Sequence, residues 1–269
     1  MDTDQMNEVV VETVELESIS LGRTVKIDIY RLEHIPASGE SSLALINDGQ
    51  DLVTIGFDKI LNTFFYGKKR KPLLVAAIHG GPDRMNEFGV AIGPDYLGRG
   101  ARAVWYEQFI VSEALPFIRQ RFSKVRFIET AVAGFSLGGL TAFDTAWNHP
   151  EIFSRVGVFS GSLWWRSKNK EDKDYNRHLH RMMHQQVRQG VLHPGMKFFF
   201  QCGEQDEWED RNKNGVIDSI DDAIDLMREL IKKGYHEGPD IRYLQLTDGK
   251  HNVETWAKSL PVFLQWGWG

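Results

Sequence analysis

The chain has 269 residues, of which 42 % are hydrophobic and 26 % charged, a balance typical of folded globular proteins. Its formal net charge of −5 provides no positive field for nucleic acid or for an anionic membrane, so we expect neither partner. The single cysteine, Cys202, excludes an internal disulfide and a cysteine-rich zinc site.

The first eight residues have neither the basic nor the apolar segment of a secretory signal peptide. No apolar run approaches the roughly 18 residues that a membrane-spanning helix needs. The expected location is therefore the cytoplasm.

The first predicted elements in chain order are two antiparallel strands. Residues 14–19 and 24–30 alternate apolar and polar side chains with a period of two, and Leu21-Gly22-Arg23 is the turn expected between them. Short apolar runs then recur, most of them followed by a helical pattern. These runs are residues 43–46, 73–78, 131–133, 156–159, 198–200 and 241–246. Such runs indicate strands that are buried on both faces of a mostly parallel sheet.

Apolar residues at helical spacing predict helices over 103–121, 140–147 and 220–233. The alternation of strands and helices predicts one α/β domain over residues 1–269, with helices on both faces of the central sheet. A polar segment, 166–195, is predicted to be partly helical and to lie near the active site as a partial lid. Ligands of such folds bind at the carboxyl ends of the strands, so we expect the functional residues directly after each apolar run.

A candidate nucleophile follows the strand at 131–133. Residues 134–138, Gly-Phe-Ser-Leu-Gly, fit the pattern G-x-S-x-G, with a strand before them and a small-residue helix start after them. Small flanking residues are needed because the serine takes a strained backbone conformation between a strand and a helix. Ser136 is the predicted nucleophile, and a glycine-rich turn with an incidental serine is the alternative.

A serine hydroxyl needs a base, and in α/β hydrolases the acid and then the histidine follow the serine in the sequence. His251 comes after the final predicted strand, and an incidental surface histidine is the alternative interpretation. Asp206 is the preferred acid, while Glu204, Glu207 and Asp210 remain open. The oxyanion needs N–H donors, for which we predict the backbone of Leu137 and, after the strand at 43–46, of Gln50.

Taken together, these motifs resemble the putative esterase family of α/β hydrolases, which includes enterochelin esterase, feruloyl esterase, S-formylglutathione hydrolase and the mycolyltransferases. The resemblance extends from about residue 14 to residue 266 and is nearest to the enterochelin-esterase-like branch. The matching pieces are Asp48-Gly49-Gln50, Arg84 to Phe88, Gly134 to Gly139, Ser160 to Trp165, Gly203 to Asp206 and His251 to Trp256.

The resemblance implies an α/β-hydrolase fold, a triad of Ser136, His251 and Asp206, and oxyanion donors at Gln50 and Leu137. The segment after Asp206 is longer and more acidic than is usual in the family, so a neighbouring carboxylate remains the alternative for the triad acid. We expect Arg84, Trp164 and Trp165 to line the substrate pocket; a core role for at least one tryptophan is the alternative. Arg84 and Glu87 are expected to pair across a loop.

Residues 210–221 fit an EF-hand-type calcium loop. Gly215 allows the sharp turn at loop position 6, and position 12 is Asp rather than Glu. The predicted ligands are Asp210, Asn212, Asn214, the Val216 carbonyl, Asp218 and Asp221. A structural Ca²⁺ is one hypothesis, and a solvated loop in which Asp218 or Ser219 caps the next helix is the other.

The sequence therefore predicts an enzyme, a serine carboxylic-ester hydrolase that needs no organic cofactor and acts on a small-molecule ester through an acyl-enzyme. Siderophore esters, feruloyl or acetyl sugars and other small esters are candidate substrates. The alternatives are an acyltransferase or thioesterase with the same triad, and a catalytically silent binding module.

Overall fold

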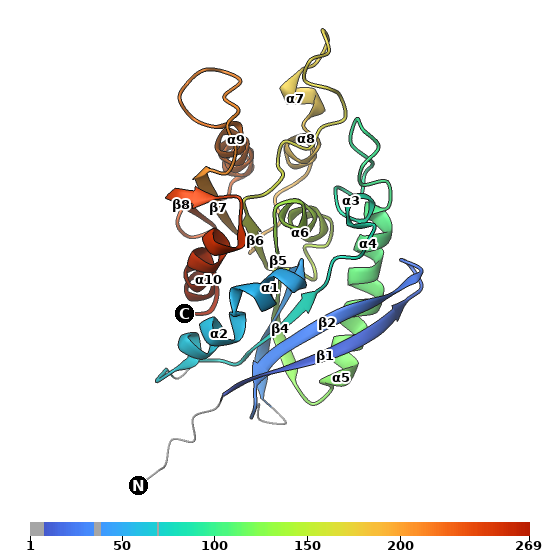
Figure 1. The fold of residues 1–269 in the computed structure, drawn as a ribbon, viewed down its shortest axis with the longest axis vertical. Coiled ribbons are helices and arrows are strands. Elements are labelled where there is room, and N and C mark those ends of the chain that lie inside the picture. Colours follow the sequence, from blue (N-terminus) through green and yellow to red (C-terminus); the bar gives the residue numbers. More distant parts are fainter. Residues whose placement is uncertain (1–7, 35–38, 69) are drawn as a thin grey trace.

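The computed structural model describes residues 8–34, 39–68 and 70–269, which form one eight-stranded sheet in the order β1-β2-β4-β3-β5-β6-β7-β8 (Figure 1). The pairs β1–β2 and β2–β4 are antiparallel, and the remaining pairs are parallel. The strands are β1 (Val9–Ser18), β2 (Arg23–Leu32), β3 (Glu40–Asn47), β4 (Leu73–Ile78), β5 (Arg126–Phe135), β6 (Arg155–Phe159), β7 (Lys197–Gln205) and β8 (Ile241–Lys250). The predicted antiparallel pair and the mostly parallel sheet are confirmed.

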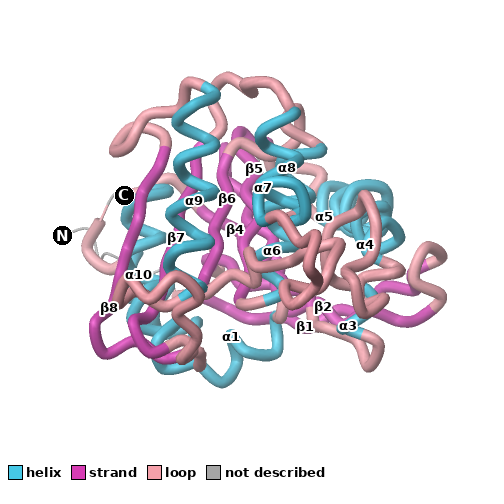
Figure 2. Tube along the Cα trace, turned by 90° about the horizontal axis from the view of Figure 1, so that it is seen from above, coloured by secondary structure: helices cyan, strands magenta, loops and turns pink. Residues whose placement is uncertain are grey.

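Helices cover both faces of this sheet, as Figure 2 shows. They are α1 (Gly49–Ile55), α2 (Phe57–Phe65), α3 (Arg84–Glu87), α4 (Ala103–Phe109), the π-helical turn η1 (Ile110–Ala114), α5 (Leu115–Arg121), α6 (Leu137–Asn148), α7 (Arg177–His180), α8 (Met182–Gln189), α9 (Asp218–Lys233) and α10 (Val253–Trp268). One core contains side chains of α1, α2 and α10, and the other contains side chains of α4 to α6, α8 and α9.

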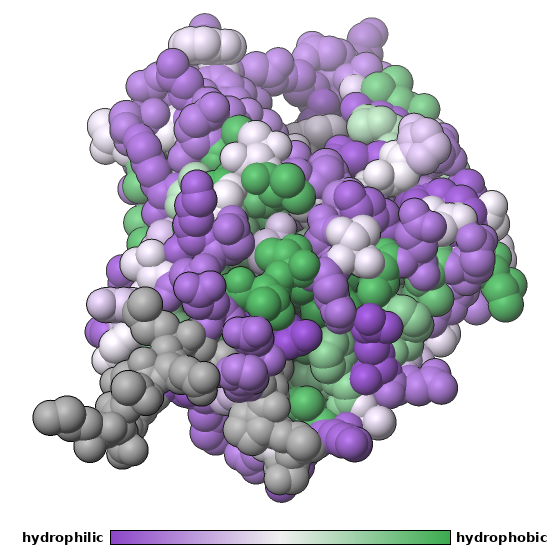
Figure 3. Space-filling model, turned by 60° about the horizontal axis from the view of Figure 1, so that its bottom comes forward, coloured by the Kyte–Doolittle hydropathy of each residue, from purple (hydrophilic) through white to green (hydrophobic). Residues whose placement is uncertain are grey.

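The central strands are continuous apolar runs because helices remove water from both of their faces. All six residues of β4 are buried, and so are seven of the eight in β3. In β1, by contrast, intermediate and exposed residues alternate along most of the strand, as expected where one face meets solvent. The space-filling view shows a mainly hydrophilic surface with hydrophobic side chains near its middle (Figure 3).

The helix predicted over 103–121 is divided by η1. The widened turn occurs just before Pro116, which lies at the start of α5 and has no backbone N–H to continue the α-helical ladder.

The segment 166–195 contains α7 and α8 and belongs to the helical layer. Arg181, at the start of α8, is buried and pairs with Asp222 (2.6 Å) and Asp225 (2.8 Å) of α9. Met183 and Val187 of α8 are buried as well. The polar composition of the segment thus conceals a packed face, and α8 is not a free-standing lid.

None of the helices in the described part of the chain is long and apolar enough to cross a bilayer.

A buried carboxylate lies in α6, the helix that follows Ser136. One oxygen of Asp144 accepts hydrogen bonds from the Ala91 N–H (2.7 Å) and the Asn148 amide (3.3 Å), and the other is buried with no partner among the described residues. Burial and the nearby charge of Glu107 raise the pKa of Asp144 to about 7. Ionising this group therefore costs more in the folded chain than in the unfolded chain.

We expect Asp144→Asn to stabilise the protein at high pH. A raised acid pKa contributes stability that is complete below the unfolded-state pKa and is lost as the pH rises through the folded-state pKa, here about 7. The asparagine has no charge to desolvate, so the variant should gain up to about 4 kcal/mol at pH 8. Thermal unfolding measures this: the two proteins should melt together at pH 4 and diverge up to pH 8, and a pH-independent difference would contradict it.

Candidate active site

The backbone places Ser136 in a sharp turn between β5 and α6. Its φ of 54° lies in the left-handed region, which costs a non-glycine residue about 1–3 kcal/mol and needs support from its surroundings. The Ser136 N–H donates to the Phe159 carbonyl (2.8 Å), and the Ser136 carbonyl accepts from the Ser162 N–H (3.1 Å). A Cβ at Gly134 would lie 2.3 Å from the Gly138 carbonyl oxygen, and one at Gly138 would lie 2.6 Å from Asp48 Oδ2, so both flanking positions need glycine. This is the geometry of a nucleophile elbow.

His251 lies between the end of β8 and the start of α10. Asn252 caps α10 by accepting the Thr255 N–H (3.1 Å), and the Trp256 ring stands edge-on to the imidazole. His251 Nε2 lies 2.8 Å from Ser136 Oγ, which is hydrogen-bonding distance across 115 residues of sequence. Partial burial lowers the pKa of His251, so the imidazole is neutral and can act as a base at neutral pH.

Asp206 immediately follows β7. Its Oδ2 accepts the Gly203 N–H (3.0 Å), whereas Oδ1 is buried and has no hydrogen-bond partner among the described residues. Burial raises the pKa of Asp206, although the Gly203 N–H, the Ser160 hydroxyl and His251 favour its ionised form. No hydrogen bond joins Asp206 to His251 within the described ranges, but the carboxylate raises the pKa of the imidazole through its charge.

The other candidate acids have partners elsewhere. Glu204 accepts the Gln245 side-chain amide (2.7 Å), and Glu207 accepts the Ser219 N–H (2.5 Å). Asp210 accepts backbone N–H groups of its own loop. Of the four carboxylates, Asp206 is the one whose charge acts on His251.

Ser160 is a further site residue that the sequence reasoning did not single out. It follows β6, has a φ of 45°, and its hydroxyl accepts the Trp256 indole N–H (3.1 Å) while stabilising the Asp206 carboxylate. The signal that could have found it is its position at the carboxyl end of a parallel strand, next to the strand of Ser136.

The two predicted oxyanion donors start neighbouring helices. Gln50 lies in the first turn of α1 and Leu137 in the first turn of α6, after the adjacent parallel strands β3 and β5. A hydrogen bond from the Asn47 amide to the Gly138 carbonyl (2.9 Å) joins the two junctions. Neither backbone N–H of the pair has an acceptor among the described residues, as the first N–H groups of a helix often do not.

A family model described as "Putative esterase" matches residues 18–266 of the chain. The chain belongs to this family. The family assignment places it among the esterases and confirms the resemblance seen in the sequence.

Solved structures share the fold of this family member at low identity. A ferulic acid esterase matches with a TM-score of 0.67 at 17 % identity, over 96 % of this chain and 97 % of that one. The enterobactin esterase FES from Shigella flexneri, solved in the presence of enterobactin, matches with a TM-score of 0.71 at 19 % identity, over 95 % of this chain and 59 % of that one. The siderophore hydrolase EstB from Aspergillus nidulans matches with a TM-score of 0.67 at 18 % identity, over 94 % of this chain and 93 % of that one.

Among curated proteins, the uncharacterized protein YbbA of Bacillus subtilis (strain 168) is 23 % identical over 135 residues. The match covers 48 % of this esterase-family chain and 53 % of YbbA. The chain thus matches about half the length of this curated relative, and 59 % of the Shigella structure.

The prediction that Arg84 pairs with Glu87 is wrong. Arg84 donates two hydrogen bonds to Asp48 (2.6 Å each), which is buried with a φ of 60° just before α1. Glu87 is instead held by two hydrogen bonds from Arg23 of β2 (2.8 and 2.6 Å). Arg84 nevertheless lies near His251, and its charge helps burial to lower the pKa of that imidazole. Substrate contact by Arg84 stays a prediction.

The two adjacent tryptophans of the predicted pocket differ in environment. Trp165 is fully buried and packs against Gly89 and Gly100, so it is a core residue and does not line a pocket. Trp164 is partly exposed, with the Arg99 guanidinium 5.0 Å from the centre of its ring. Trp164 is therefore the one of the pair that a substrate can reach.

The acidic loop leads from β7 to α9. The Asn212 amide donates to Asp221 (2.7 Å), and the Gly215 N–H donates to Asp210 (2.9 Å). Asp218 instead accepts the Arg211 N–H (2.8 Å). Across residues 8–34, 39–68 and 70–269, no group of three or more His, Cys, Asp or Glu is placed to hold a metal. The calcium hypothesis for this esterase-family chain stays a prediction.

Calcium addition tests this hypothesis. A structural Ca²⁺ should raise the melting temperature, because a ligand at 100 times its Kd stabilises the folded state by about 2.7 kcal/mol. Chelation with EGTA should reverse the shift, and Asp221→Asn should abolish it. Identical melting curves in CaCl₂ and EGTA would support the solvated loop instead.

Proposed function

We propose that this chain is a serine carboxylic-ester hydrolase that works through an acyl-enzyme. The observation that carries the proposal is the 2.8 Å distance between His251 Nε2 and Ser136 Oγ at a positive-φ turn. Family membership supports the same chemistry from an independent direction.

In the proposed mechanism, His251 removes the hydroxyl proton while Ser136 Oγ attacks the ester carbonyl. The N–H groups of Gln50 and Leu137 stabilise the oxyanion of the tetrahedral intermediate. His251 then gives its proton to the leaving alcohol, and the acyl group stays on Ser136. Water, deprotonated by His251, attacks the acyl-enzyme, and His251 returns the proton to Ser136 Oγ as the carboxylic acid leaves.

Asp206 is the proposed partner of the imidazole. Its Oδ1 is a buried acceptor without a hydrogen bond among the described residues, and its charge already favours the protonated His251. We propose that Oδ1 accepts the Nδ1–H of His251 during the reaction, which fixes the tautomer and stabilises the imidazolium.

The proposed substrate is a small-molecule ester. Structures that share the fold are named for ferulic acid, enterobactin and siderophores, which makes feruloyl and siderophore esters the first compounds to test. The partly exposed Trp164, with Arg99 above its ring, supports a flat acyl or alcohol group on that side of the site.

The test combines fluorophosphonate labelling with a panel of acetyl, feruloyl and siderophore esters. Wild type should be labelled at Ser136 and should hydrolyse at least one ester, whereas Ser136→Ala should do neither. Ser123→Ala, which changes an exposed serine in a turn, is the matched control. An unlabelled wild type would favour the binding module, and transfer of the acyl group to an added alcohol in preference to water would favour an acyltransferase.

A further inference from the structure

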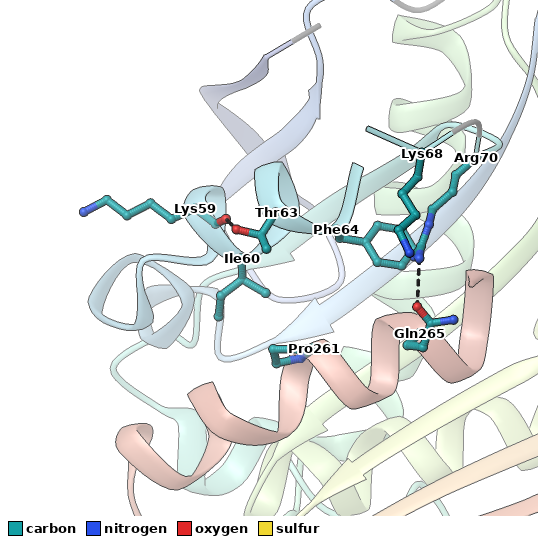
Figure 4. A pocket seen from close by; sticks show the side chains of 8 residues that line it. All are labelled: Lys59, Ile60, Thr63, Phe64, Lys68, Arg70, Pro261 and Gln265. Carbon is teal, nitrogen blue, oxygen red and sulfur yellow. Dashed lines mark hydrogen bonds between the residues drawn. The ribbon is translucent and has the colours of Figure 1, made fainter. Parts of the chain in front are cut away.

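An open pocket of about 450 Å³ lies between α2 and α10 (Figure 4). None of the proposed active-site residues lines it. Lys68 and Arg70 of its wall precede the amino end of β4, whereas the candidate active site is at the carboxyl ends of the strands. Along α10, about 18 Å of helix separates Gln265 of the pocket from the helix start beside His251. The pocket is therefore distinct from the candidate active site.

The charged side chains of the pocket are all positive. Lys59, Lys68 and Arg70 line it, and no acidic residue does. Figure 4 shows Lys68 and Arg70 directed toward the ring of Phe64, whereas Lys59 points away. Neither Lys68 nor Arg70 has an ion pair within the part of the chain that the structure describes. In a chain with a net charge of −5, this is a local concentration of positive charge.

Arg70 is held in place with an N–H group still unused. Its guanidinium carbon lies 3.9 Å above the centre of the Phe64 ring, and its Nη2 donates to the Gln265 side-chain oxygen (2.8 Å). Its Nη1 is buried and has no hydrogen-bond partner among the described residues. A buried cationic donor without an acceptor is costly, and a negative charge in the adjoining pocket would offset part of that cost.

The rest of the pocket is largely apolar. Ile60 and Phe64 of α2 and Pro261 of α10 line it, and its volume lies within the range of small-molecule sites. Inorganic phosphate would leave this apolar wall unused, and a neutral lipid would leave the cations unused. The chemistry matches a molecule with one anionic end and a short apolar body.

We propose that this pocket binds an amphipathic organic carboxylate. The carboxylate accepts a hydrogen bond from the Lys68 ammonium group and lies beside the positive charge of Arg70, and the alkyl or aryl body packs on Ile60, Phe64 and Pro261. The binding site does not depend on the proposed hydrolytic activity.

Isothermal titration with hexanoate tests the proposal. Wild type should bind hexanoate, and hexan-1-ol should bind at least tenfold more weakly. The double variant Lys68→Gln/Arg70→Gln should lose at least tenfold in affinity. Arg126→Gln, which removes an exposed arginine outside the pocket, is the matched control and should bind within twofold of wild type.

Two further binding measurements use a second pocket variant and a protein whose active site is blocked. Thr63→Trp places a large ring at the pocket wall without removing a cation, and should also abolish binding. Protein labelled with fluorophosphonate at Ser136 should bind hexanoate as before. Unchanged binding in both pocket variants, equal binding of the alcohol, or loss of binding on labelling would each overturn the proposal.

Discussion

Ser136→Ala is expected to lower kcat for ester hydrolysis by about 10⁵- to 10⁶-fold, because it removes the hydroxyl that lies 2.8 Å from the imidazole. His251→Ala should cost about as much, and the double variant should be no worse than either single variant, since the two groups act as a unit. Initial rates on the best ester of the panel measure this, with Ser123→Ala as the control.

Circular dichroism should show that both variants are folded. The Ser136 and His251 side chains meet at the surface of the site, so removing either leaves the two cores intact. A Ser136→Ala protein that retains activity within tenfold of wild type would disprove the proposed mechanism.

Asp206→Asn is expected to lower kcat by about 10⁴-fold, because an amide holds the wrong imidazole tautomer. The variant should also change the pH profile. In wild type, burial lowers the pKa of His251, so kcat/KM should rise along an acid limb below pH 6.5 and stay flat through neutrality. The Asp206 charge raises the pKa of His251, so its removal should move this limb to still lower pH.

Glu204→Gln is the matched control for Asp206→Asn. Glu204 lies two residues away, is exposed and is hydrogen-bonded to Gln245, so this variant should keep nearly full activity and the wild-type profile. The reverse pattern, with Glu204→Gln inactive and Asp206→Asn active, would show that Glu204 and not Asp206 is the acid.

Local sequence patterns were sufficient to predict the mostly parallel sheet and to place Ser136 and His251 after its strands. Buried strands need apolar runs, and parallel strands bring their carboxyl ends to one edge, so residues after the runs meet there. The π-helical turn was not predictable in the same way, because Pro116 is tolerated in the first turn of a regular helix as well.

Side-chain pairing across the chain could not be predicted. Arg84 donates to Asp48, which has a left-handed backbone conformation just before α1, and not to Glu87 three residues away. Glu87 in turn meets Arg23, which is 64 residues earlier in the sequence. Such choices depend on loop geometry that has no local sequence signal.

The position of β8 at the end of the strand order has a consequence for local stability. Its neighbour in the described sheet is β7, and most of its residues are not buried. An edge strand of this kind can detach at a lower free energy than the central strands, and His251 would leave with it. Low concentrations of urea should therefore abolish ester hydrolysis while most of the tertiary structure persists. Loss of activity and global unfolding would then be separate transitions.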